Sequence, residues 1–137
     1  MSKIDVPKLW ATKYRLLGQV FADVHPAIAD LGLEMKELLL LSEVDEHPYP
    51  AELADVTFMP KPSVTLYLKN LEAAGHVKRE IDKADLRRHR ITLTPTGRKV
   101  MTKGLGLLAD AFGKRLGRLT PAQQASLMHM LETMVAD

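Results

Sequence analysis

The sequence contains no cysteine, which excludes disulfide bonds, thiolate metal sites and a cysteine nucleophile. It also has no long hydrophobic run, because the longest, Leu38–Leu41, is far too short to cross a bilayer. The first ten residues lack the apolar core of a signal peptide, so we expect a cytoplasmic protein without a membrane partner. Glycine and proline, at eight each, are too few for a low-complexity or collagen-like chain.

The residues that are present are typical of one globular domain: the chain has 137 residues, of which 46% are hydrophobic and 26% charged. The net charge of +2 indicates little about partners, but its distribution is uneven. Residues 21–56 carry nine acids against one base, a net charge of −8, whereas residues 76–103 carry nine bases against three acids, a net charge of +6. A concentrated basic stretch suits a polyanionic ligand, although a charge run alone is more often a solvated surface.

Hydrophobic residues recur at three- and four-residue steps in the first part of the chain, which is the spacing of amphipathic helices. The first predicted helix covers residues 7–31, and Pro26 predicts a kink or a break there because it removes a backbone donor. A second, mostly buried helix is predicted over residues 34–44. A short third helix is predicted to begin at Pro50 and to end near Asp55.

A turn is predicted over residues 57–60, followed by a fourth helix. Pro62 suits the first helical position, where its missing donor is not needed. The apolar face of this helix is predicted to consist of Val64, Leu68 and Leu71. Gly75 is expected just after the helix, since glycine is free to take a positive φ. A short helix, a tight turn and a second helix form a helix-turn-helix.

The hydrophobic period then changes from 3.6 to 2. Residues 77–81 and 89–94 alternate between apolar and polar side chains, and the polar segment 82–88 joins them. This pattern predicts a β-hairpin with a long, basic tip. The basic stretch therefore lies on a hairpin that follows a helix-turn-helix. This location supports a role in binding a polyanion that the charge alone does not support.

Two further helices are predicted after Thr94 and Thr120, because each of these capping residues is followed by proline. The terminal helices carry apolar faces with no partner left in so small a domain, which favours a two-fold interface between chains over an intrachain bundle. The fold class is therefore predicted to be mainly α with a small β-hairpin wing. The predicted parts are an N-terminal dimerisation helix (1–33), a winged helix-turn-helix (34–96) and C-terminal dimerisation helices (97–137).

Several motifs have fixed spacing. Asp85-Leu86-Arg87 is followed by five residues, then by Leu93-Thr94 and, after two more, by Gly97. In this respect the sequence resembles the MarR (multiple-antibiotic-resistance regulator) family of bacterial transcription factors, whose wing pattern is Asp-x-Arg, five residues, Leu-Thr and then Gly. Further segments that look like the family are Glu52-Leu53-Ala54, Ser63-Val64-Thr65 and the run from Leu71 to Val77.

The resemblance implies a sequence-specific regulator that binds double-stranded DNA as a homodimer on a palindromic operator, most commonly as a ligand-responsive repressor. A helix fits the major groove, and the amides at Lys61–Ser63 favour a phosphate. The resemblance implies that Arg87 enters the minor groove, with Asp85 pairing to it or shaping the loop. The candidate DNA-binding residues are Lys61, Pro62, Ser63, Thr65, Lys69, Asn70, Lys78, Arg79, Asp85, Arg87, Arg88, His89 and Arg90.

The sequence also departs from the family pattern on the predicted recognition helix. The family often carries an arginine where this chain has Leu66, and Asp and Arg are common where it has Lys69 and Asn70. The turn before the helix, Pro60-Lys61-Pro62, is stiffer than usual. The bases that are read therefore do not transfer from the family to this chain. Tyr67 can either face DNA or pack on the core.

Family members often respond to a small aromatic or phenolic ligand held between the dimer helices and the DNA-binding lobe. Candidate lining residues are Trp10, Tyr14, His25, Met35 and Leu39, for each of which packing in the core is the alternative. No cofactor and no metal is expected. The methionines of the last helix favour interface packing over a metal site.

Three other classes of protein remain as alternatives. An enzyme is disfavoured because no nucleophile motif, phosphate loop or His-Glu-x-x-His spacing is present. A zinc sensor requires that His25, Glu43, Asp45 and His47 converge on one site. The third alternative is a winged-helix module used only for protein–protein contact. The salt dependence of DNA binding separates it from a DNA-binding protein.

Overall fold

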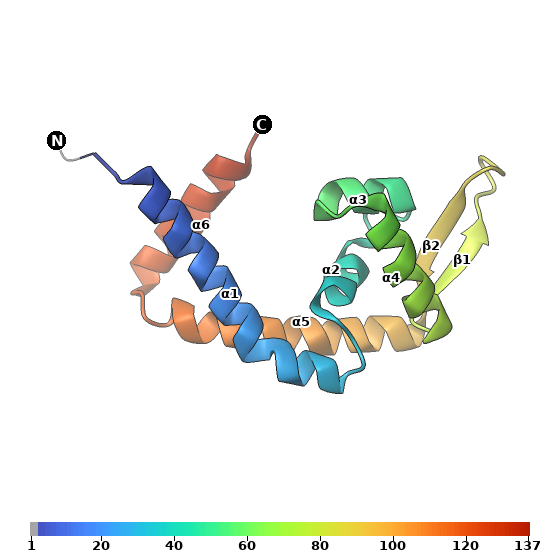
Figure 1. The fold of residues 1–137 in the computed structure, drawn as a ribbon, viewed down its shortest axis with the longest axis horizontal. Helices are drawn as coiled ribbons and strands as arrows, with labels where there is room; N and C mark the ends of the chain where they lie inside the picture. The colour runs from blue at the N-terminus through green and yellow to red at the C-terminus, as the bar shows by residue number, and fades with distance from the viewer. Residues whose placement is uncertain (1–2) are drawn as a thin grey trace.

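The computed structural model describes residues 3–137, which fold into helices and one antiparallel β-hairpin (Figure 1). The elements are α1 (Val6–Asp30), α2 (Met35–Glu43), α3 (Pro50–Thr57), α4 (Lys61–Ala73), β1 (Val77–Ile81), β2 (His89–Leu93), α5 (Pro95–Leu116) and α6 (Pro121–Val135). The predicted fold class, mainly α with a small hairpin, is confirmed. No helix within the described part of the chain is long and apolar enough to span a membrane.

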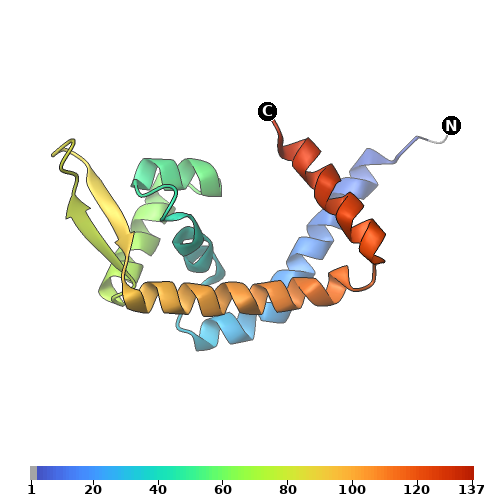
Figure 2. The same cartoon turned by 180° about the vertical axis from the view of Figure 1, so that it is seen from behind.

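Helix α5 runs along one side of the molecule and joins two lobes (Figures 1 and 2). One lobe contains α2, α3, α4 and the hairpin. The other contains α6 and the N-terminal part of α1, which project away from α5 on the side to which the wing also points. The candidate DNA-binding elements and the terminal helices are therefore separate in space and are connected by α5 and by the C-terminal part of α1.

The core lies in the helix-turn-helix lobe. Four of the nine residues of α2 are buried, and α4 turns the predicted apolar face of Val64, Leu68 and Leu71 inward. The strands contribute Val77 and Ile91, and the C-terminal part of α1 adds Val24 and Ile28. The end of α1 thus belongs to the same core as the DNA-binding lobe, because the apolar stripe of α1 continues into it.

The helix α1 continues without a break through Pro26 to Asp30. The sequence predicted a kink or a break at this proline, and the break is absent. Val24 and Ile28, on either side of Pro26, are both buried against the lobe. We attribute the continuity to this packing, which offsets the one backbone hydrogen bond that proline removes.

The hairpin has the predicted strands, with Val77 opposite Leu93 and Ile81 opposite His89. Gly75 ends the preceding helix with φ of +80°, as predicted for a residue that needs the left-handed region. Thr94 joins the hairpin to α5, because its hydroxyl accepts a hydrogen bond from the Gly97 amide at 2.9 Å and donates one to the Gly75 carbonyl at 2.6 Å. The wing base and the start of α5 are therefore fixed to each other.

Candidate nucleic-acid interface

Helix α4 presents a polar outward face opposite its buried face. The candidate DNA-binding residues on this helix are exposed, except Ser63, which is half-buried; the exposed ones are Lys61, Pro62, Thr65, Lys69 and Asn70. Leu66 lies among them and is also exposed. Tyr67 packs against the core instead. The pKa of Tyr67 is raised, mainly by this partial burial and to a smaller extent by the nearby Glu34. The structure thus decides the Tyr67 alternative in favour of packing.

The N-terminus of α4 has fewer free amides than the sequence predicts. The Ser63 and Val64 amides both donate to the Pro60 carbonyl, at 3.0 and 3.1 Å. Pro62 has no amide hydrogen. The expectation of a phosphate site built from free amides at Lys61–Ser63 is therefore wrong for Ser63 and Pro62, and the Lys61 side chain is the main cationic group at this helix end.

The wing tip holds Arg87 in an ordered but accessible position. The Asp85 carboxylate accepts hydrogen bonds from the Arg87 backbone amide at 3.0 Å and from its Nε at 3.2 Å. The side chain of Arg87 is nevertheless 90% exposed. The pKa of Asp85 is lowered, mainly by the hydrogen bond from the Arg87 guanidinium and next by the one from the Arg87 backbone amide. This carboxylate is therefore ionised at neutral pH. Asp85 both pairs with Arg87 and shapes the loop.

Arg88 is directed toward the protein rather than outward. Its guanidinium lies 3.5 Å from the centre of the Tyr49 ring and 3.9 Å from a carboxylate oxygen of Glu52. The Tyr49 hydroxyl in turn donates a hydrogen bond of 2.6 Å to Asp82. That bond is the main cause that lowers the pKa of Asp82 and raises the pKa of Tyr49. Arg88 therefore stacks within a cluster that links the wing to α3.

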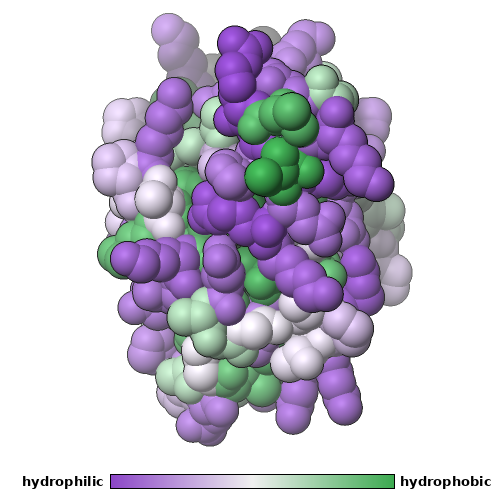
Figure 3. Space-filling model, turned by 90° about the vertical axis from the view of Figure 1, so that its right-hand side faces the viewer, coloured by the Kyte–Doolittle hydropathy of each residue, from purple (hydrophilic) through white to green (hydrophobic). Residues whose placement is uncertain are grey.

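The remaining cations of the hairpin are divided between its two faces. The strand register places Lys78 and Arg90 on the face opposite the core, where both are exposed. Arg79 and His89 share the face of the buried Ile91. Arg79 is also held by Glu72 of α4, with a distance of 3.2 Å from its Nε to the carboxylate. Seen from the wing side, the surface is mainly hydrophilic, with hydrophobic residues showing in several separate places (Figure 3).

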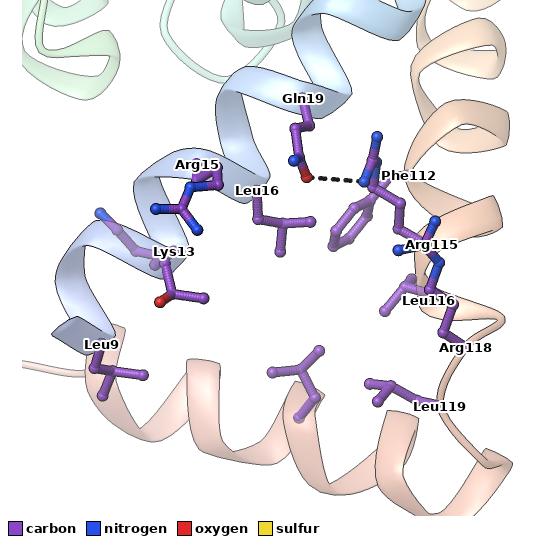
Figure 4. Close-up of a pocket in the computed structure, with 12 residues that line it drawn as sticks. Leu9, Lys13, Arg15, Leu16, Gln19, Phe112, Arg115, Leu116, Arg118 and Leu119 are labelled. Atoms are coloured by element: carbon purple, nitrogen blue, oxygen red, sulfur yellow. Dashed lines mark hydrogen bonds between the residues drawn. The ribbon is translucent and has the colours of Figure 1, made fainter. Parts of the chain in front are cut away.

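The candidate ligand residues do not converge in the single chain. Trp10, Tyr14 and His25 are exposed on α1, whereas Met35 and Leu39 are partly buried on α2. A separate cavity of about 550 Å³ lies between the N-terminal part of α1, the end of α5 and α6, and none of the five residues lines it (Figure 4). Its walls are mostly apolar, with Leu9, Leu16, Phe112, Leu116, Leu119 and Leu127 among the lining residues.

The terminal helices leave large apolar surfaces uncovered. No residue of α6 is buried. The exposed apolar side chains on these two helices include Val6, Leu9, Trp10, Tyr14, Leu17, Met128, Met130, Leu131, Met134 and Val135. Arg115 joins α5 to α1 through hydrogen bonds to Asp23 and Gln19 of 2.9 and 2.8 Å. The apolar faces of α1 and α6 therefore lack a partner within residues 3–137 large enough to cover them.

The four residues considered for a zinc site do not form one cluster. Ligand atoms of Glu43, Glu46 and His47 lie within 4.8 Å of one another, and this group, found within residues 3–137, excludes His25 and Asp45. Asp45 forms two hydrogen bonds with Arg98 instead, at 3.0 and 3.1 Å. The four residues that the zinc-sensor alternative requires therefore do not assemble into one site.

The chain has relatives among known transcription regulators. A profile of the MarR family matches residues 31–88. The chain is 30% identical to the HTH-type transcriptional repressor Rv2887 of Mycobacterium tuberculosis (strain ATCC 25618 / H37Rv), over 139 aligned residues that cover 100% of both proteins.

Solved structures have the same fold. The M. tuberculosis MarR family protein Rv2887 in complex with DNA gives a TM-score of 0.78 at 29% identity, with 93% of this chain and 98% of that chain covered. Its complex with p-aminosalicylic acid gives 0.78 at 28% identity, with the same coverage. Bordetella bronchiseptica BpsR, whose DNA binding is regulated by 6-hydroxynicotinic acid, gives 0.80 with full coverage of both chains, but at 20% identity it supports the fold alone.

Proposed function

The chain belongs to the MarR family, and from this premise we propose that it is a ligand-responsive transcriptional repressor that binds double-stranded operator DNA. The observation that carries the proposal is the exposed polar face of α4 beside a hairpin whose tip presents Arg87. The relative Rv2887 is a repressor whose structure with DNA has the same fold. The proposal includes no catalytic activity, and it places the protein in the cytoplasm with its operator.

On DNA, α4 enters the major groove and the wing follows the backbone to the adjacent minor groove. Thr65, Lys69 and Asn70 then face base edges or phosphates. Arg87 meets the negative potential of a narrow minor groove. The outward cations Lys78 and Arg90 contact phosphates, which fix the register of the protein without reading sequence.

The protein acts as a homodimer through its terminal helices. Residues 1–33 and 97–137 supply the dimer interface, and residues 34–96 bind DNA, although the end of α1 also packs on the DNA-binding core. The uncovered apolar faces of α1 and α6 support this division, because a partner chain would remove them from water. Two-fold symmetry then matches a palindrome with half-sites about 34–36 Å apart.

We extend the ligand response of the relatives to this chain as binding of a small aromatic acid, since Rv2887 forms complexes with p-aminosalicylic and salicylic acids. Trp10, Tyr14 and His25 are exposed in the single chain, so a site that includes them would be completed by the second subunit. The proposal requires two geometries of the dimer, one that matches the half-site spacing of the operator and one that does not. A ligand that binds the mismatched geometry more tightly lowers DNA affinity, and the size of this effect is set by the ratio of the ligand's affinities for the two geometries.

A salt titration on the operator, which is first obtained by selection from random DNA, tests the function. With Lys61, Lys78 and Arg90 on phosphates in both subunits, we expect log affinity to fall with log salt with a slope of about −5. Lys78→Gln should make the slope shallower by about 2, because each dimer loses two phosphate contacts. The control Lys114→Gln, at the far end of α5, should leave the slope unchanged. A flat slope for the wild type would instead identify a protein–protein module.

A further inference from the structure

The wing is attached to the helix-turn-helix through a buried carboxylate that DNA contact does not explain. Asp82 directly follows β1 and is only 8% exposed. One of its oxygens accepts the Tyr49 hydroxyl at 2.6 Å, and the other accepts the Ala84 amide at 2.8 Å. Tyr49 lies immediately before α3, so this bond joins the first helix of the helix-turn-helix to the end of the first wing strand.

The same tyrosine also holds the other side of the wing loop. The Arg88 guanidinium stacks on the Tyr49 ring at 3.5 Å. The Asp82 amide donates to the Arg88 carbonyl at 2.9 Å, which closes the loop, and the Arg88 amide donates to the Asp85 carbonyl at 2.9 Å. Tyr49 therefore contacts both residues that close the loop of residues 83–87. That loop contains Arg87 and the carboxylate that orients it.

We propose that Tyr49, through its contacts with Asp82 and Arg88, is a positioning residue that fixes the wing so that Arg87 meets the minor groove. The proposal rests on the proposed DNA-binding function. A two-stranded hairpin alone is marginally stable in water, so its direction depends on such attachments. An arginine that is already in place loses less conformational freedom when DNA binds, and this raises affinity without a new contact to DNA.

The test compares Tyr49→Phe with the wild type in two backgrounds. Phenylalanine keeps the ring beneath Arg88 and removes only the hydroxyl that bonds to Asp82. We expect operator affinity to fall by roughly three- to tenfold, the scale of one lost hydrogen bond. In an Arg87→Ala background the same change should have no further effect, because Tyr49 acts through Arg87. Tyr67→Phe is the matched control and should leave affinity unchanged, since its hydroxyl is beside Glu34 and away from the wing.

An equal loss of affinity in both backgrounds, or no loss in either, overturns the proposal. Failure of the wild type to bind DNA would overturn the proposed function instead, so the two failures are distinguishable. Arg88→Gln gives an independent reading. As part of the same arrangement, it should lower affinity with an unchanged salt slope, whereas a phosphate contact by Arg88 would make the slope shallower by about 2 per dimer. Thermal unfolding of each variant confirms that it is folded.

A different observation concerns Leu66 on the recognition helix. Leu66 is 56% exposed, one turn after Pro62 and one turn before Asn70, on the outward face of α4. Folding gains little from this side chain. On the basis of the proposed DNA-binding function, we further infer that Leu66 packs against the C5-methyl group of a thymine in each half-site, because thymine is the only base that presents an apolar group in the major groove. An arginine at this position would favour guanine instead.

Replacing single thymines of the selected operator by uracil tests this inference, because the exchange removes only the methyl group. At one thymine per half-site we expect the wild type to lose about fourfold in affinity, the scale of one buried methyl group. Leu66→Ala should abolish that penalty, and the control Phe58→Ala, in the preceding turn, should keep it. Uracil tolerated at every position, or a penalty that persists in Leu66→Ala, contradicts the inference while leaving DNA binding itself in place.

Discussion

Replacing Arg87 with alanine is expected to lower operator affinity by roughly tenfold to a hundredfold while the dimer remains intact. Arg87 is a cation of the wing loop with a side chain that is 90% exposed and already oriented by Asp85. Its removal takes a positive charge from the minor groove, where the potential is most negative. Fluorescence anisotropy with labelled operator measures the affinity, and light scattering measures the oligomeric state.

A matched substitution separates this contact from a general effect of charge. Arg98→Ala removes another guanidinium from the same half of the molecule, but Arg98 is paired with Asp45 and is not on the wing. We expect it to change affinity by less than about threefold, the scale of an exposed ion pair. Wild-type affinity in the Arg87→Ala variant would reject the role of the wing, and a dissociated dimer would show that the substitution acts elsewhere.

Gly97→Ala is expected to lower the free energy of unfolding by about 3 kcal/mol, because the new Cβ has no room. It would collide with the carbonyl oxygen of His76 and lie 2.7 Å from the carbonyl carbon. That oxygen also accepts the Thr94 amide at 3.1 Å, so it is held by the wing base and cannot move freely. Because the His76 carbonyl atoms belong to the backbone, their overlap with the new Cβ can be relieved only if α5 moves away from the hairpin.

Gly106→Ala provides the control within the same helix. Nothing lies within 4 Å of a Cβ at Gly106, so alanine there should raise the free energy of unfolding by up to about 1 kcal/mol through its helix propensity. Urea unfolding at one fixed protein concentration measures both variants, because the stability of a dimer depends on concentration. Equal stability of Gly97→Ala and the wild type would contradict the close approach of His76.

The hairpin was predicted almost residue for residue because its alternating pattern is local, and the structure confirms both strands with β2 ending one residue earlier. The helix starts at Thr94 and Thr120 were also predictable, since a capping side chain acts within three residues. The continuity of α1 through Pro26 was not, because it depends on burial against segments distant in sequence. Interactions within a few residues therefore determine where these helices and strands begin and end, whereas tertiary packing determines that α1 continues through Pro26.

The candidate site was predictable in its elements but not in the direction of every side chain. Arg87 and Asp85 form the pair that the wing pattern implied. The Tyr49–Asp82 bond joins residues 33 positions apart, and no local pattern signals such a contact. Arg88 therefore looked like another outward cation, although its guanidinium lies on Tyr49. The amide of Ser63 is not free because α4 begins at Lys61, one residue before the predicted first position at Pro62, which brings the Pro60 carbonyl within reach of that amide.

The length of helix α5 would amplify a small rotation of the helix. Its 22 residues span about 33 Å, from the Thr94 cap at the base of the wing to Arg115, which is hydrogen-bonded to α1. A tilt of only about 5° at the α1 end would displace the hairpin base by about 3 Å. A small change in packing among the terminal helices would therefore produce a larger displacement of the hairpin, and an effector that binds near those helices would change the distance between the two DNA-binding lobes of a dimer without contacting DNA.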